Sequence, residues 1–243
     1  MSASESAERL VQRPMHPAPG RTAWAVYVYE APVRLWHWVM VLCMVVLVVT
    51  GYFIGSPLPS IGGEASDHTL FGIIRMAHFI AGQLLAVFTV MRVYWAFVGN
   101  EFAHELFLPP LWKMSYWKGL FLQIGYYMFL IPKPRKHLGH NELAGFAMLF
   151  QCMLPMIFMI FSGMALYAEG KGMDHWTYTA FGWLIGLVGG SYQLHTLHHA
   201  AMWVILSFVA IHLYMVFRED VMGRTGIMSS IVSGWRFMKD DEP

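Results

Sequence analysis

The chain alternates between long apolar runs and polar segments, and four of the runs are long enough to cross a membrane. A bilayer core of about 30 Å requires roughly 20 consecutive apolar residues in a helix. The runs that meet this requirement are residues 36–55, 73–98, 144–168 and 197–217. The pattern predicts an all-α integral membrane protein built as a four-helix bundle, and Pro155 is expected to kink the third helix.

Two further apolar stretches are weaker candidates for membrane spans. Residues 119–132 are too few and follow Trp112, Lys113, Trp117 and Lys118, so we interpret them as an amphipathic interfacial helix. Residues 176–194 are long enough, but four glycines weaken this stretch as a helix that stands alone. We expect the second stretch to be interfacial or re-entrant.

Basic residues gather in alternate polar segments. Four spans would bring to one side Arg9, Arg13, Arg21, Arg34, Lys113, Lys118, Lys133, Arg135, Lys136, Arg218, Arg224, Arg236 and Lys239. The other two loops hold only Arg75 and Lys171, beside Glu64, Asp67, Glu169 and Asp174. Because cytoplasmic loops carry an excess of Lys and Arg, we expect both termini in the cytoplasm and the protein in the cytoplasmic membrane. A fifth span would move the basic tail outside.

The composition and the lack of catalytic motifs agree with a membrane protein that does not itself activate hydrogen, oxidise formate or use NAD. The 243 residues are 57% hydrophobic and 13% charged, against about 25% charged in soluble domains. A net charge of +1 gives no footprint for nucleic acid. Cys43 and Cys152 lie in apolar runs, so we expect no disulfide. The sequence has no C-x-x-C-H, which excludes covalent c-type haem, and it has no nucleotide-binding or iron–sulfur cluster motif.

The boundaries of the apolar region suggest three parts. We expect a mobile cytoplasmic arm over residues 1–26, a transmembrane domain over 27–223 and a cytoplasmic tail over 224–243. The first 33 residues are rich in Pro and lack an apolar h-region, so they do not resemble a cleaved signal peptide.

Four histidines lie near the ends of the predicted spans: His37, His78, His198 and His212. Ionisable residues at membrane depth are costly and indicate function. The 14 residues between His198 and His212 bring both to within about 40° of one helix face, about 21 Å apart. In the four-span topology, His37 and His212 share the cytoplasmic leaflet, and His78 and His198 share the outer one.

Two histidines in each leaflet favour haem over a protein-bound metal ion. A zinc site normally needs three or four protein ligands, whereas haem iron needs only two axial ones. We therefore predict two haem b groups, one held by His37 and His212 and one by His78 and His198, in an electron-transfer protein. His195 and His199 are alternatives to His198, although both point to a different face from His212; otherwise they have interfacial or surface roles.

Other residues could support the same cofactors. Arg34 and Arg75 each stand three residues before a predicted ligand and share its helix face, so each could pair with a haem propionate. The alternative is that both are snorkelling arginines.

Small and polar residues inside the spans can likewise be interpreted as cofactor contacts or as ordinary structural residues. Gly51, Gly82 and Gly163 could admit a flat cofactor, but ordinary helix packing is the favoured interpretation. Arg92 is interpreted as an anchor near the cytoplasmic end rather than as a quinone ligand.

Two motifs connect the chain to a known family. One is R-L-W-H-W followed by an apolar run that ends in T-G, over residues 34–51. The other is H-T-L-H-H-x-x-M-W followed by a further histidine, over residues 195–212. With residues 27–55, 74–100, 139–141 and 195–223, the chain resembles the b-type cytochrome subunit of membrane-bound nickel-iron uptake hydrogenases. Ala200, where the family carries a larger aliphatic residue, is a small departure that concerns local packing.

The resemblance implies the partners and the direction of electron flow. It implies a subunit that docks on the iron–sulfur small subunit of the hydrogenase, and through it on the large subunit. Electrons would pass from the outer haem (His78, His198) to the inner haem (His37, His212) and then to quinone.

Two alternatives remain at the level of sequence. The cytochrome b subunit of a membrane formate dehydrogenase looks similar, but Glu30-Ala31-Pro32 and Arg218-Glu219-Asp220 fit the hydrogenase subunit better. The other is a haem-free membrane scaffold or transporter whose histidines relay protons or fill polar contacts.

Overall fold

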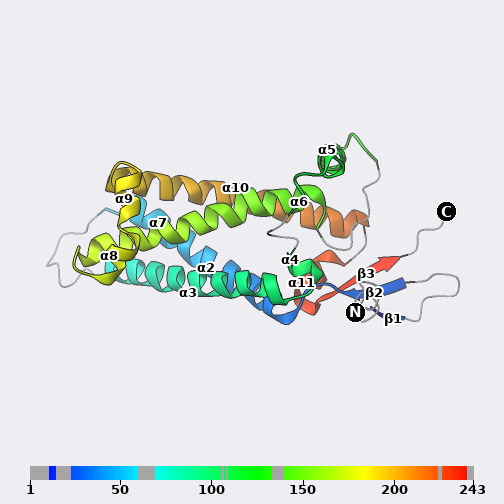
Figure 1. Ribbon diagram of the computed structural model, residues 1–243, viewed down its shortest axis with the longest axis horizontal. Helices are drawn as coiled ribbons and strands as arrows, with labels where there is room; N and C mark the ends of the chain where they lie inside the picture. Colours follow the sequence, from blue (N-terminus) through cyan, green and yellow to red (C-terminus); the bar gives the residue numbers. More distant parts are fainter. Residues whose placement is uncertain are drawn as a thin grey trace. The chain divides into compact units, whose positions relative to one another are not determined.

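The computed structural model describes residues 11–14, 23–59, 69–104, 107, 109–132, 140–223 and 226–239. Four long helical runs dominate these ranges (Figure 1). They are α2 (Ala31–Gly55), α3 (Leu70–Val98), the run from α6 to α7 (Glu142–Lys171) and α10 (Ser191–Gly223). Each is long and apolar enough to cross a membrane, and in the described part of the chain they are the four helices of that kind. The predicted all-α membrane fold with four spans is confirmed.

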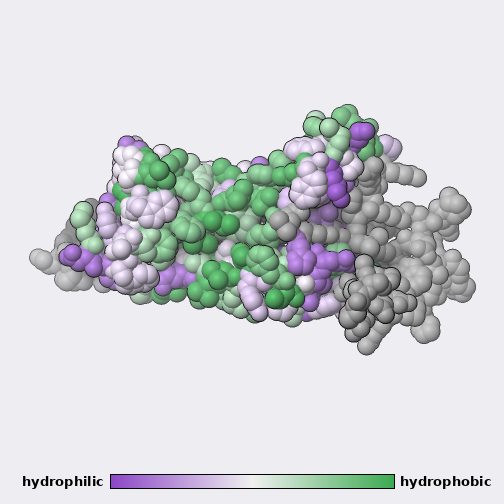
Figure 2. Space-filling model, in the orientation of Figure 1, coloured by the Kyte–Doolittle hydropathy of each residue, from purple (hydrophilic) through white to green (hydrophobic). Residues whose placement is uncertain are grey.

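Large apolar side chains cover the outer faces of these helices. Leu42, Val90 and Phe97 are 67%, 70% and 78% exposed, and Figure 2 shows hydrophobic residues over much of the long helices' surface. Soluble proteins rarely expose such continuous apolar surface. Because every backbone group inside a helix is already hydrogen-bonded, these faces suit contact with lipid.

The third span is interrupted near the predicted position. It consists of α6 (Glu142–Ala147), the π-helix η2 (Met148–Met153) and α7 (Leu154–Lys171). Pro155 follows directly after this π-helix inside the continuous helical run, where it has no N–H to donate to the preceding turn. The π-helix directly before Pro155 is an irregularity of the kind that often accompanies a kink in a helix.

The chain divides into two compact units, and each long helix contributes one segment to each unit. The first unit comprises Met1–His37, Arg92–Leu149 and Val209–Pro243, and the second comprises Trp38–Met91 and Phe150–Phe208. His37 and His212 fall in the first unit, and His78 and His198 in the second.

The first unit also holds shorter elements. They are α4 (Glu101–His104), α5 (Met114–Tyr127), α11 (Ile227–Ser233), β1 (Val11–Pro14), β2 (Ala23–Tyr27) and β3 (Trp235–Lys239). The three strands form an antiparallel sheet in the order β1-β2-β3, with Tyr27 opposite Trp235. Gly234 directly precedes β3 and has a φ of 88°, which side chains other than glycine rarely adopt. A Cβ there would also lie 2.7 Å from the Tyr29 carbonyl oxygen, so only glycine fits.

The sheet joins the described parts of the arm and the tail, which the sequence analysis treated as separate segments. Their boundaries at residues 26 and 224 stay predictions. Arg9, Arg21, Glu64, Asp67, Lys133, Arg135, Lys136 and Arg224 lie outside the described residues.

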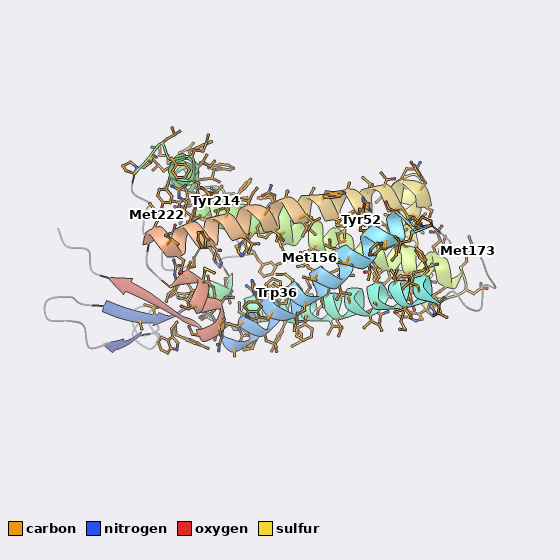
Figure 3. The ribbon with its side chains drawn as sticks, turned by 180° about the vertical axis from the view of Figure 1, so that it is seen from behind. Trp36, Tyr52, Met156, Met173, Tyr214 and Met222 are labelled. Carbon is orange, nitrogen blue, oxygen red and sulfur yellow. The ribbon has the colours of Figure 1, made fainter. Side chains whose placement is uncertain are left out.

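The second unit is closed by two short helices between α7 and α10. They are α8 (Trp176–Phe181) and α9 (Trp183–Leu187), and both are far too short to cross a bilayer. A small core of Ala165, Leu184 and Leu194 fixes them to α7 and α10. Figure 3 shows the fully buried Met156 among the long helices and Met173 beyond the end of α7.

Candidate functional site

A large cavity lies inside the second unit. Its volume is about 650 Å³, and residues of α2, α3, α7 and α10 line it. This size is within the range of small-molecule and cofactor sites, about 300–1,000 Å³. Aliphatic residues, methionines and glycines make up most of the lining, and His78, His198, Arg75 and Gln83 also reach it.

His78 of α3 and His198 of α10 face this cavity and are close enough to interact electrostatically. Each ring is held through its Nδ1 atom by a hydroxyl group from another helix. The Thr50 Oγ1 atom lies 2.9 Å from Nδ1 of His78, and the Ser162 Oγ atom lies 2.7 Å from Nδ1 of His198. In each ring Nε2 is then the nitrogen left to bind a metal.

A glycine follows each of these hydroxyl residues and lies against the same imidazole. A Cβ on Gly51 would be 3.2 Å from Cε1 of His78, and a Cβ on Gly163 would be 3.3 Å from Cε1 of His198. Both distances are shorter than ordinary van der Waals contact. The imidazole rings therefore occupy the space that a side chain at Gly51 or Gly163 would need. Thr50-Gly51 and Ser162-Gly163 thus form the same cradle twice, on different helices.

The two histidines that flank His198 also line the cavity, with different contacts. Nδ1 of His195 lies 3.0 Å from the Ser191 carbonyl oxygen, one turn back on its own helix. His199 packs against Gly55, where a Cβ would be 3.2 Å from its Cε1 atom. His198 is the member of the trio whose cradle repeats that of His78.

In the first unit the structure brings His37 and His212 into electrostatic range of one another. His140, beside the start of α6, also interacts with His212. The structure therefore places the four predicted ligands in two pairs, one in each unit.

Arg92 lies in the part of α3 that belongs to the first unit, and its side chain is 4% exposed. Its Nη2 atom donates a hydrogen bond of 3.0 Å to the Ala103 carbonyl oxygen. The guanidinium carbon lies 5.6 Å from the ring centre of Trp36 and 5.2 Å from that of Phe107. These aromatic and backbone contacts fit an anchor between helix ends.

The two arginines that precede predicted ligands differ in their surroundings. Arg75 lines the cavity together with His78. Arg34 donates a hydrogen bond from Nη1 to the carbonyl oxygen of Val232 in α11. Arg75 is available to an anionic group in the cavity, whereas Arg34 is engaged with the backbone.

The donor set fits haem. Among the residues that the structure describes, no three or more His, Cys, Asp or Glu side chains gather as metal ligands. A planar macrocycle with four nitrogens of its own needs only two axial imidazoles and apolar walls. The cavity between His78 and His198 offers both.

Sequence reasoning missed Thr50 and Ser162. The signal was the repetition of a hydroxyl residue followed by glycine in the first and third spans. It could not be interpreted alone, because the histidines that these residues contact lie on the second and fourth spans.

Comparison with known proteins agrees with this geometry. Residues 28–234 match the model of the family described as prokaryotic cytochrome b561. A protein of Rhizobium leguminosarum bv. viciae is 52% identical over 90% of this chain and 91% of its own length. One of Azotobacter vinelandii is 52% identical over 92% and 93%. Each is named "Probable Ni/Fe-hydrogenase B-type cytochrome subunit".

A more distant relative from Escherichia coli K12 is 45% identical over 88% of this chain and 91% of its own length. Its name is "Probable Ni/Fe-hydrogenase 1 B-type cytochrome subunit". With four membrane-spanning helices and a family match over most of its length, this chain belongs to the prokaryotic cytochrome b561 family of integral membrane proteins, which bind haem b.

Proposed function

We propose that this chain is the membrane cytochrome subunit of a nickel-iron hydrogenase. It anchors the hydrogenase to the membrane and carries electrons from the iron–sulfur small subunit towards quinone through two haem b groups. The observation that carries the proposal is the sorting of His37, His78, His198 and His212 into two pairs, one in each unit. The names of relatives that are about half identical over nearly the whole chain supply the hydrogenase.

Each histidine pair would hold one haem by its iron. When bound, two such haems would supply one-electron carriers on the two sides of the bilayer. Two imidazoles occupy both axial positions, which favours electron transfer over the binding of small molecules. The aliphatic and methionine side chains of the 650 Å³ cavity would exclude water from the outer site.

The orientation follows from the distribution of basic residues. Four spans bring the basic segments to one side, which we assign to the cytoplasm together with both termini. His78 and His198 then lie in the outer leaflet, nearest the hydrogenase, and His37 and His212 lie nearest the site of quinone reduction. Arg75, in the lining of the outer cavity, would pair with a haem propionate.

A haem count tests the ligand assignment. We would record reduced-minus-oxidised spectra and pyridine haemochrome content of the purified protein, then of His78→Ala and His212→Ala. The expected result is two haems per chain in the parent and one in each variant.

Matched histidine variants sharpen this experiment. His199→Ala removes a cavity histidine beside His198 and is expected to keep both haems, whereas His198→Ala loses one. Loss of a haem in His199→Ala alone would transfer the ligand role to His199. A folded, colourless parent protein would refute the haem sites and favour a scaffold or transporter.

The partner needs a separate test. In membranes that contain the whole hydrogenase complex, hydrogen should reduce the haems, and added quinone should reoxidise them. If formate and not hydrogen reduces the haems in native membranes, the donor is a formate dehydrogenase.

A further inference from the structure

The hydroxyl proton of Thr50 is directed towards backbone carbonyls in the preceding turn of its own helix. Thr50 Oγ1 lies 2.6 Å from the carbonyl oxygen of Val46, one turn back in α2. Two oxygens approach this closely only when a proton lies between them. The Thr50 hydroxyl therefore donates to Val46, and its oxygen faces Nδ1 of His78 with lone pairs only.

Ser162 repeats this arrangement on α7. Its Oγ atom lies 2.8 Å from the Phe158 carbonyl oxygen, again one turn back, and 2.7 Å from Nδ1 of His198. Since a serine hydroxyl has a single proton, the bond to Phe158 leaves the oxygen as an acceptor towards His198. Both hydroxyls are in helix interiors, where donation to the preceding turn is a common arrangement.

The imidazoles must then carry their protons on Nδ1. Each Nδ1–H donates to a hydroxyl oxygen, so each Nε2 presents a lone pair. Neutral imidazole with a free Nε2 is the form that binds iron. The protein thus prepares both rings for ligation through contacts that involve no cofactor atom.

We propose that Thr50 and Ser162 are positioning residues that fix the tautomer and orientation of His78 and His198 and lower the reduction potential of the haem that these histidines bind. The proposal rests on the haem site proposed above. A hydrogen bond from the second ring nitrogen raises the basicity of an imidazole ligand. A more basic ligand favours ferric over ferrous iron, so the bond lowers the potential.

Loss of the Thr50 hydroxyl and loss of the Ser162 hydroxyl should change the reduction potential by different amounts. The ring of His78 also interacts with the backbone carbonyl of Leu47, which stays as an acceptor for this ring when the Thr50 hydroxyl is lost. Among the described residues, His198 is hydrogen-bonded through its ring to Ser162. Loss of the Ser162 hydroxyl is therefore expected to have the larger effect.

The test uses Thr50→Val and Ser162→Ala in the full chain. Redox titration followed at the haem absorption bands should show a positive shift for one haem and none for the other. For Ser162→Ala we expect about a tenfold change in the ratio of oxidised to reduced haem at fixed potential, or about 59 mV for one electron. The shift for Thr50→Val should have the same sign and be smaller. The low-spin signal of that haem in electron paramagnetic resonance should move with it.

The chain provides matched controls. Thr89 is buried in α3 and donates to the Leu85 carbonyl over 2.7 Å, and Ser207 in α10 donates to that of Val204 over 2.7 Å. Thr89→Val and Ser207→Ala remove the same helix bond without a histidine partner and should leave both potentials unchanged. Thr50→Ser and Ser162→Thr keep the hydroxyl and should restore the parent potential.

Two outcomes would overturn the inference. One is unchanged potentials and spectra in both variants when both haems are retained. The other is equal shifts in the variants and in their controls, which would mean a general packing effect. If a variant loses its haem, Thr50→Ser decides, because it keeps the hydroxyl and adds no atom: haem and potential like those of the parent support the proposal, and haem loss there too contradicts it. A parent without haem would refute the proposed function instead.

Discussion

Arg75 is the charged side chain that joins His78 in the lining of the cavity. We predict that Arg75→Gln lowers the potential of the outer haem, because loss of a positive charge beside a propionate disfavours the added electron. The effect should be modest, since Arg75 is exposed and salt screens its charge. Redox titration at low and high ionic strength would measure it.

Arg34→Gln is the matched control for this charge. The guanidinium of Arg34 already bonds to the Val232 carbonyl, so we expect little change in either potential. If Arg75→Gln leaves both haems unaffected, Arg75 is a snorkelling interfacial residue and has no part in the site.

Gly163 tests how closely the imidazole of His198 is fitted. In Gly163→Ala the new methyl group would lie 3.3 Å from Cε1 of His198, so the ring must shift by a few tenths of an ångström. We predict lower haem retention and a changed spectrum of one haem, although the Ser162 hydroxyl stays in place. Gly72→Ala in α3, where the methyl group meets nothing within 4 Å, should behave as the parent. Equal spectra for the two variants would contradict a close fit.

At the scale of single residues, the sequence predicted the pairing of the four histidines but not the residues that contact them. The histidines could be found because helical spacing and span order assign each one to a leaflet. Thr50 and Ser162 could not, because their role depends on contacts between helices that no local pattern records. Arg34 shows the converse: its spacing from His37 matched that of Arg75 from His78, yet α11 supplies it with a backbone partner.

Among the elements, the C-terminal end of α5 is bonded to α10 mainly through Arg218, with Tyr214 as a second donor to the Tyr127 carbonyl over 3.3 Å. Arg218 donates from Nη1 to the Tyr127 carbonyl and from Nη2 to the Tyr126 carbonyl, each over 2.7 Å. Its guanidinium carbon also lies 4.0 Å from the ring centre of Phe129. The last carbonyls of a helix lack partners within the helix, so Arg218 closes the C-terminal end of α5.

We predict that Arg218→Met releases this end of the helix. Hydrogen bonds to charged groups contribute about 1.5–3 kcal/mol, which corresponds to roughly a 10-fold to 100-fold change in local opening. Hydrogen–deuterium exchange should therefore become faster at Met128, Phe129 and Leu130, whose amides bond to the last turns of α5. Lys118→Met, which removes an exposed positive charge from α5 itself, should leave their exchange rates unchanged. Equal protection in the two variants would show that Arg218 does not hold α5.

The elements also show where sequence patterns stop being informative. Apolar length predicted all four spans, but α10 begins at Ser191, six residues before the predicted start. The polar turn around His195 belongs to the helix, and the preceding break comes from Gly189 and Gly190 at φ 94° and 130°. The sheet was missed because β2 and β3 are short strands from opposite ends of the chain.

For the molecule as a whole, the proposed order of electron transfer depends on which side of the membrane each histidine pair faces. The assignment rests on charge bias, and the four spans place the loop between α7 and α8 opposite the loop that follows α5. Exposed residues exist in both loops: Met173 is 75% exposed and Met128 is 63% exposed. The native Cys43 and Cys152 are buried and can be replaced by alanine to give a background without thiols.

In that background we predict opposite labelling of Met173→Cys and Met128→Cys. A membrane-impermeant maleimide added to spheroplasts should react with Met173→Cys, because the proposed topology puts the α7–α8 loop outside, and should reach Met128→Cys only after lysis. Both variants should react in detergent, which shows that neither thiol is shielded by the protein. The reverse pattern would invert the topology and put the pair His37 and His212 nearest the hydrogenase. Labelling of both thiols in spheroplasts would mean that residues 142–171 do not cross the membrane, and the assignment of the histidine pairs to opposite leaflets would fail with it.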